Sequence, residues 1–360
     1  MKSIAFLSSL LILLLFTSCK EEIIVVSDQK ETAVIYGVLD PSESIQYIKI
    51  TKAINGTANA LEEAKNETAN YFDDVDATVF EIINGDTVRT WTLKDTIVSG
   101  RATGLYYGPT QKVYFFRTSS NKPLRAESGV FYHFQAKLNN KYTVSGVTDI
   151  VREIAVTNPS TYEFATTNVG KDGYAQTSLN VFSGTATVVN VHLDILVQEK
   201  LANNTTQIVT LPWKISESSV PVGKLINLSI NGEEFYKTIA DNFKNQPSVN
   251  QRKLIGIDLT ATFGSSTLEK YIALNKPSSS LAQTKPNFTN ITSKDDIRLY
   301  GIFTSTNKIT RNSRFSPAPQ QKRVINVYSS KELCNGKLTN GLNFCTEDNY
   351  PELKNFYCKN

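Results

Sequence analysis

The sequence predicts a mainly β protein, with an N-terminal immunoglobulin/fibronectin-like β-sandwich followed by a β-rich α+β domain. The chain has 360 residues, which is enough for two domains, and its 16 Tyr and 18 Phe favour strands over helices. Short apolar or alternating segments separated by turn sequences recur between residues 33 and 148. After residue 156, helical spacing appears among the strand patterns. No internal repeat or heptad is present.

The first predicted domain, residues 32–155, is built from closely spaced strands. Strands are predicted at 33–39, 45–50, 77–83, 87–93, 113–117, 132–138 and 141–148. Asn84-Gly85-Asp86 is typical of a tight hairpin turn. Asn139-Asn140 can adopt the left-handed conformation that a second hairpin requires. Seven short strands with turns between them favour a sandwich.

The second predicted domain, residues 156–330, follows the boundary sequence Asn158-Pro159-Ser160. Strands are predicted at 191–197, 207–213, 255–263, 297–304 and 324–329. Asn231 is the expected cap of a helix whose apolar stripe is Phe235, Ile239 and Phe243, because side chains four residues apart share one helix face. Ser266-Thr267-Leu268-Glu269 resembles a capping box and predicts a second short helix.

The amino terminus has the order of a secretory signal. Met1-Lys2-Ser3 is followed by an apolar run at 4–16 and then by Cys19. The run is about 13 residues long, whereas a membrane-spanning helix needs roughly 20, so a permanent transmembrane anchor is the weaker alternative. We therefore expect a signal peptide at 1–18 and a tether at 19–31.

The sequence that ends at Cys19 resembles a bacterial lipobox, although Phe16 stands where Leu is commoner. The resemblance implies that Cys19 carries a diacylglyceryl thioether and a third acyl chain, such as palmitate. Lys20, Glu21 and Glu22 resemble the export signal of Bacteroidota lipoproteins, which implies an outer-membrane location facing the cell exterior. A lipoprotein that faces the periplasm is the alternative.

Three cysteines lie in the predicted tail, residues 331–360: Cys334, Cys345 and Cys358. In an exported chain this number predicts one disulfide and one remaining thiol. The sequence leaves open which two cysteines pair. No Cys-x-x-Cys or nearby His indicates zinc, and we expect neither a metal nor a cofactor.

Few residues point to chemistry, and no nucleophile elbow, metalloprotease motif or phosphate-binding loop occurs. His133 is interpreted as a structural residue. His192 and Asp194 share a strand face and are interpreted as a surface pair, with an acid–base dyad as the alternative. Six acids between Glu62 and Asp76 are interpreted as a solvated loop, with calcium as the alternative.

The charge of the chain excludes a nucleic-acid-binding role. Lys plus Arg is 38 and Asp plus Glu is 34, a net charge of +4. Residues 297–330 contain six basic residues and no acid. This stretch is interpreted as a solvated loop and edge strand protected by charge, and the alternative is contact with phosphates or an acidic glycan.

Three segments resemble an uncharacterised family of Bacteroidota lipoproteins often encoded beside SusC-like, TonB-dependent porins. They are 34–39 leading to 47–50, 131–151, and Phe288-Thr289-Asn290-Ile291 followed by Tyr300-Gly301-Ile302-Phe303. Asp295-Asp296 stands where that family usually has glycine. The resemblance implies a binding or accessory module that works with a porin or surface assembly and engages a glycan or peptide. An adhesin or structural surface component is the alternative, and a hydrolase using loop carboxylates is a weaker one.

Overall fold

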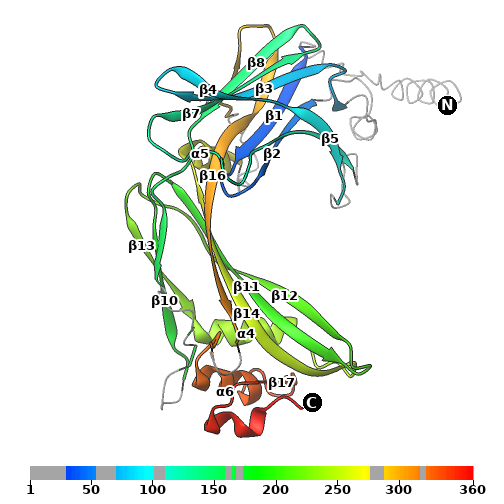
Figure 1. Cartoon of the computed structure of the whole chain (residues 1–360), viewed down its shortest axis with the longest axis vertical. Helices are drawn as coiled ribbons and strands as arrows, with labels where there is room; N and C mark the ends of the chain where they lie inside the picture. Colours follow the sequence, from blue (N-terminus) through cyan, green and yellow to red (C-terminus); the bar gives the residue numbers. More distant parts are fainter. Residues whose placement is uncertain are drawn as a thin grey trace, which may run out of the picture.

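The computed structural model describes residues 30–53, 70–100, 110–158, 164, 166–167, 173–275, 288–316 and 322–359. These residues form two lobes, each with its own hydrophobic core, joined by one long strand (Figure 1). The protein is mainly β, as predicted. No helix in the described ranges is both long and apolar enough to cross a membrane.

The first lobe is a sandwich of two sheets. One sheet has the order β1 (Thr32–Leu39), β2 (Ile45–Lys52), β6 (Gln111–Arg117), β5 (Lys94–Val98). The facing sheet has the order β15 (Ile291–Ser293), β8 (Tyr142–Thr148), β7 (Val130–Leu138), β3 (Val75–Ile83), β4 (Asp86–Thr92). When β1 to β8 are lettered A, B, C, C′, D, E, F and G along the chain, the first sheet has the order ABED and the second contains the order GFCC′. These are the two sheets of immunoglobulin domains. The predicted fold class is therefore confirmed.

Tyr132 of β7 adds a second immunoglobulin-like feature. Its ring is fully buried, and its hydroxyl accepts a hydrogen bond from the backbone N–H of Arg125 at 2.6 Å. This contact has the form of the tyrosine corner, in which a tyrosine of strand F bonds to backbone upstream. Burial raises the pKa of Tyr132 to about 12, so the phenol is neutral at physiological pH.

Strand β16 (Arg298–Arg314) joins the two lobes. Its first half pairs in parallel with β1, and its second half pairs antiparallel with β14 (Val249–Gly264). The predicted sandwich domain ends at residue 155, whereas the sheets of the sandwich also contain residues from 291–305. Pairing with β16 covers the edge of β1, which would otherwise expose unpaired backbone groups.

Asn290 links two segments noted in the sequence, Asn290-Ile291 and Gly301-Ile302-Phe303, by hydrogen bonds. Its side chain accepts a hydrogen bond from Phe303 N at 2.9 Å and donates one to Phe303 O at 2.7 Å. The Phe303 ring then lies between the two sheets, 5.5 Å from the Phe134 ring. Gly37 and Gly146 leave room for it, since a Cβ on either would lie within 3 Å of Phe303.

The second lobe packs a large sheet against a smaller one and a helix. The large sheet has the order β12 (Thr206–Ser219), β11 (Val188–Leu201), β14, β16. The small sheet has the order β13 (Leu225–Asn231), β10 (Gln176–Phe182), β9 (Ala155–Asn158), and α4 spans Gly232–Asn242. As predicted, the Asn231 side chain caps α4, and Phe235, Ile239 and Phe243 are buried in the core.

The end of the chain covers the base of this lobe with α6 (Val327–Asn335), β17 (Phe344–Cys345) and the 3-10 helix η2 (Pro351–Phe356). The predicted strand at 324–329 is wrong, because Asn326 caps a helix there by accepting from Ser329 N. A short apolar run cannot distinguish a buried strand from a buried helix turn. Helix α5 (Ser266–Asn275) matches the second predicted helix, although the hydroxyl that contacts its first turn belongs to Ser265.

Candidate functional site

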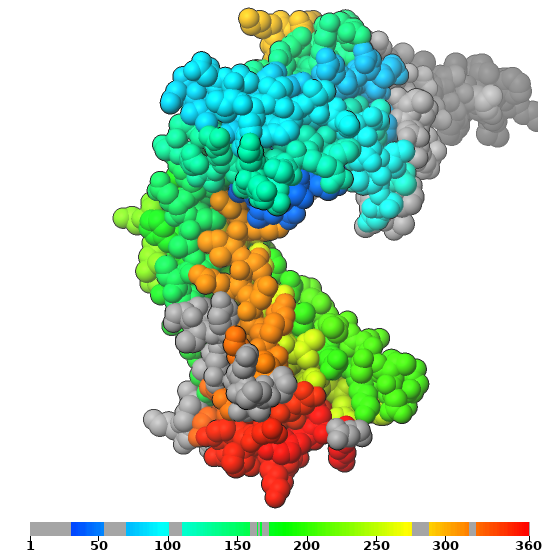
Figure 2. Space-filling model, in the orientation of Figure 1, coloured from blue at the N-terminus to red at the C-terminus, as the bar shows by residue number. Residues whose placement is uncertain are grey.

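One face of the nine-stranded sheet lines a hollow between the lobes, and we call it the concave sheet face. Figure 2 shows the hollow, with β1 and β2 (blue) above it, β16 (orange) behind it and β11 and β12 (green) below it. Alternate residues of β16, from Tyr300 to Arg314, lie on this side of the strand, while Phe303 and Ile309 pack into the two cores. Among the alternate residues Ile302 and Thr304 are buried, and the Thr304 hydroxyl contacts that of Ser265 just before α5. A single strand therefore contributes to both walls.

The upper wall carries an exposed aromatic patch, defined as Tyr36, Tyr47, Phe115 and Tyr300. Tyr36 and Tyr47 are 37% and 46% exposed, which is unusual for rings on central strands of a sheet. The Tyr47 and Phe115 rings are cross-strand neighbours 6.3 Å apart. Burial and a 2.9 Å hydrogen bond to the Tyr271 hydroxyl of α5 raise the pKa of Tyr36, so its phenol is neutral at physiological pH.

The lower wall carries a polar ladder of three rows across β11, β14 and β16. The rows are Asn190–Thr262–Lys308, His192–Thr260–Thr310 and Asp194–Asp258–Asn312. All nine side chains lie on the side away from the core and are half-buried or exposed. Hydroxyl and amide groups both donate and accept hydrogen bonds, so the ladder presents a dense array of both functions.

The charges near the ladder are compensated within the protein. Lys308 pairs with Glu43, Arg314 with Asp258, and Lys214 with Glu217. The Glu43 hydrogen bond raises the pKa of Lys308, which keeps this lysine charged and paired. The lower wall therefore has little free charge to offer an ionic ligand.

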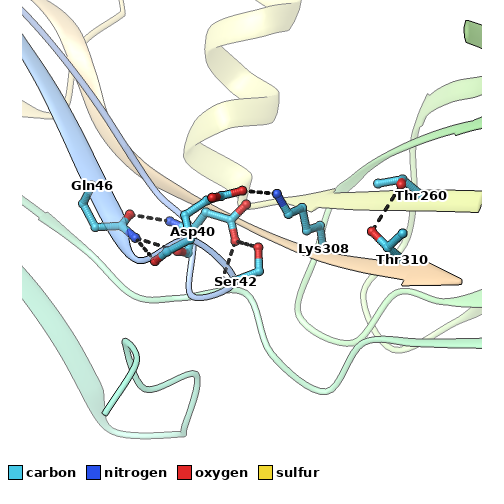
Figure 3. Close-up of polar contacts among 7 residues, drawn as sticks. Asp40, Ser42, Gln46, Thr260, Lys308 and Thr310 are labelled. Atoms are coloured by element: carbon cyan, nitrogen blue, oxygen red, sulfur yellow. Dashed lines mark hydrogen bonds and ion pairs between the residues drawn. The ribbon is translucent and has the colours of Figure 1, made fainter. Parts of the chain in front are cut away.

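Side chains in and next to the β1–β2 turn connect the upper wall to β16 where the two walls meet (Figure 3). Gln46 donates hydrogen bonds of 2.7 Å to the carbonyls of Asp40 and Glu43 and accepts one from Asp40 N at 2.9 Å. This turn presents Glu43 to Lys308 of β16. Beyond it, the Thr260 and Thr310 hydroxyls lie 3.2 Å apart on the ladder. The Lys308–Glu43 pair therefore links the β1–β2 turn of the first lobe to β16.

The site residues predicted from the sequence fall in different places. Cys19, Lys20, Glu21 and Glu22 lie outside the described residues. Cys345 and Cys358 form a disulfide, which confirms the prediction of one disulfide, and Cys334 keeps a free thiol. Burial raises the pKa of Cys334 to about 12, so its thiol is protonated at neutral pH. The tail cysteines lie in the second lobe, away from the aromatic patch.

The histidines and the acidic stretch take local roles. His192 Nε2 lies 3.9 Å from Asp194 Oδ2, which is a loose surface ion pair rather than a hydrogen bond. His133 lies 6.0 Å from the Phe80 ring on the outer face of its sheet. Asp73 and Asp74 donate their backbone N–H groups to the Asn139 side chain. Within the described ranges no three His, Cys, Asp or Glu residues are placed to hold a metal.

Three of the six basic residues in 297–330 pair with acids from elsewhere in the chain. Lys308 and Arg314 form the pairs described above, and Arg323 pairs with Asp348. Arg311 donates to the Val156 carbonyl at 3.2 Å. The interpretation of this stretch as a solvated loop and edge strand is wrong for residues 298–314, because β16 lies inside the nine-stranded sheet, between β14 and β1. Contact with phosphates or an acidic glycan stays a hypothesis.

Sequence reasoning missed the concave sheet face. The alternation of Asn190, His192 and Asp194 with apolar residues marked one polar face of a strand. Tyr36 and Tyr47 lie at alternate positions whose neighbours are buried, which was a signal for exposed rings. Neither pattern shows that the two strands belong to one bent sheet.

Comparisons with known proteins identify no relative from which a function could be inferred. No protein-family model matches the chain, and no curated protein matches it. Among solved structures, the C-terminal globular domain of an oligosaccharyltransferase from Pyrococcus abyssi aligns at 8% identity, with a TM-score of 0.19. That alignment covers 80% of this chain and half of the archaeal chain.

Proposed function

We propose that this protein is a lipid-anchored, surface-exposed binding module whose concave sheet face holds an extended glycan. The observation that carries the proposal is the composition of that face. Its upper wall offers neutral aromatic rings, on which the C–H face of a sugar ring can pack. Its lower wall offers rows of donors and acceptors with compensated charge, which suit hydroxyl groups.

The geometry favours a glycan over a peptide. Peptides that add to a sheet bind chiefly through main-chain hydrogen bonds at a free strand edge. The concavity instead presents the face of a sheet, where the backbone groups of β11, β14 and β16 are already paired. A ligand on this face must be recognised by side chains, and those available are aromatic, hydroxyl and amide groups.

Replacing Tyr47 by alanine is expected to weaken glycan binding about tenfold, equivalent to about 1.4 kcal/mol. Retardation of the purified protein in native gels containing neutral polysaccharides measures the change. Tyr328→Ala is the matched control, because Tyr328 of α6 is 42% exposed but lies outside the concave sheet face. Equal retardation of the Tyr47 and Tyr328 variants, or no retardation of the wild type by any polysaccharide, contradicts the proposal.

The outer-membrane address rests on the lipobox and export-signal resemblances at Cys19–Glu22 and on multi-chain lipid anchoring. Replacing Lys20, Glu21 and Glu22 by alanine is expected to leave the protein lipidated but protected from protease added to whole cells. Wild-type protein should be cleaved and should co-purify with a TonB-dependent porin from mild detergent. Cleavage of the alanine variant at the wild-type rate would show that these three residues are not the signal for surface export.

A further inference from the structure

A pocket of about 260 Å³ lies at the end of the concave sheet face that is farthest from the aromatic patch. Gln198 and Lys200 of β11 continue the polar side of that strand into it, and Gln251 and Lys253 of β14 form its floor. The tail closes it with Cys358 and Lys359. The neighbouring cavity beside Cys334 has only about 30 Å³, room for about one water.

Two lysines give this pocket a positive charge that no acid among the described residues compensates. Arg252 is neutralised by Glu199 at 2.8 Å, and Lys253 by Glu347 at 2.7 Å. Lys200 and Lys359 have no acidic partner in the described part of the chain. This contrasts with the polar ladder, where Lys308, Lys214 and Arg314 are each paired with an acid. Hence the pocket suits an anion and the ladder does not.

Two sets of interactions fix the position of the Lys359 backbone. The Gln251 side chain donates to Lys359 O at 2.6 Å and accepts from Lys359 N at 3.0 Å. The Cys345–Cys358 disulfide holds the preceding residue against β17, which pairs with β14. The Gln251 amide is thus held by Lys359, whereas the Gln198 amide has no partner among the residues described.

We propose that this pocket binds the carboxylate of a uronic acid residue, at one end of a glycan that lies on the concave sheet face. The inference rests on the proposed function for the glycan. Lys200 and Lys359 supply two charged donors and Gln198 a third, neutral donor, and a carboxylate can accept all three through its two oxygens. The rest of the sugar chain, which is rich in hydroxyl groups, then follows the polar side of β11 toward the polar ladder.

Calorimetric titration of the full chain with an oligogalacturonate and with its methyl ester tests this inference, because the two probes differ only in the charged carboxylate. The acid is expected to bind at least about tenfold more tightly at low salt, and the advantage should shrink as salt is added. The double variant Lys200→Gln/Lys359→Gln should bind the two probes equally. Lys237→Gln, an exposed lysine of α4, is the control and should behave like wild type.

The outcomes separate this inference from the proposed function. If the ester binds in a Tyr47-dependent manner and the acid binds no more tightly, the proposed function stands and the pocket assignment is overturned. If only the acid binds, and its binding depends on Lys200 and Lys359, the pocket assignment is supported and the role of the aromatic patch is not. Inorganic phosphate that binds with the same lysine dependence overturns the assignment to a sugar acid. Binding of neither probe overturns the pocket assignment, and the proposed function is then decided by the native-gel test with neutral polysaccharides.

Discussion

Phe303→Ala is expected to lower the free energy of unfolding of the first lobe by about 3–5 kcal/mol. The ring is fully buried between the two sheets and contacts Phe134. Gly37 and Gly146 have no side chains that could move into the space, so the cavity cannot collapse easily. The loss of stability should be confined to the sandwich. Phe303 belongs to this domain although it lies more than 150 residues after β8, which corresponds to strand G of immunoglobulin domains.

Hydrogen exchange followed by mass spectrometry can localise the effect, because the two lobes have separate cores. Amides of β1 and β8 should exchange faster in the variant, while those of β11 should change little. Tyr300→Ala, on the exposed side of the same strand, is the control and should cost no more than about 0.5 kcal/mol. Faster exchange confined to β11 would mean that the sandwich closes without Phe303.

Arg252→Ala is expected to destabilise the second lobe by about 3–5 kcal/mol and to release the tail. Arg252 is 1% exposed and donates to Glu199 at 2.8 Å and to the Leu342 carbonyl at 2.8 Å. Its removal leaves a buried carboxylate without its charge partner, and that carboxylate retains only a hydrogen bond from Gln207. The same change removes a link between β14 and the segment that leads to β17.

Urea unfolding and limited proteolysis of residues 331–359 measure the two parts of this prediction. Arg314→Ala is the matched control, because it breaks an arginine–aspartate pair on the same sheet whose side chains are 45% and 21% exposed, and it should cost at most about 1 kcal/mol. The double variant Arg252→Met/Glu199→Leu should recover much of the stability, since no unpaired charge remains buried. A single variant as stable as the control would show that the buried pair does not anchor the tail.

Local patterns predicted the elements where one face of a strand or helix is buried. The alternation in β7 and β14 and the stripe of α4 each record one buried face, and Asn231 marks the start of α4 by its capping chemistry. The strand β10 was missed because Leu179 and Val181 are the only fully buried positions in it. The 324–329 strand was predicted wrongly because its apolar residues are too few to define a period.

The strand-rich class, the turns at Asn84-Gly85 and Asn139-Asn140, and the presence of one disulfide with one spare thiol could be predicted from the amino-acid sequence. These features follow from side-chain periodicity, backbone preferences and cysteine count. Three features emerge from the fold alone: β16 closes the sandwich, Cys345 pairs with Cys358, and aromatic and polar rows share one concave face. Those features depend on pairing between segments as much as 266 residues apart, such as Thr32 with Arg298, and no local pattern encodes such a pairing because its register is set by the packing of both cores.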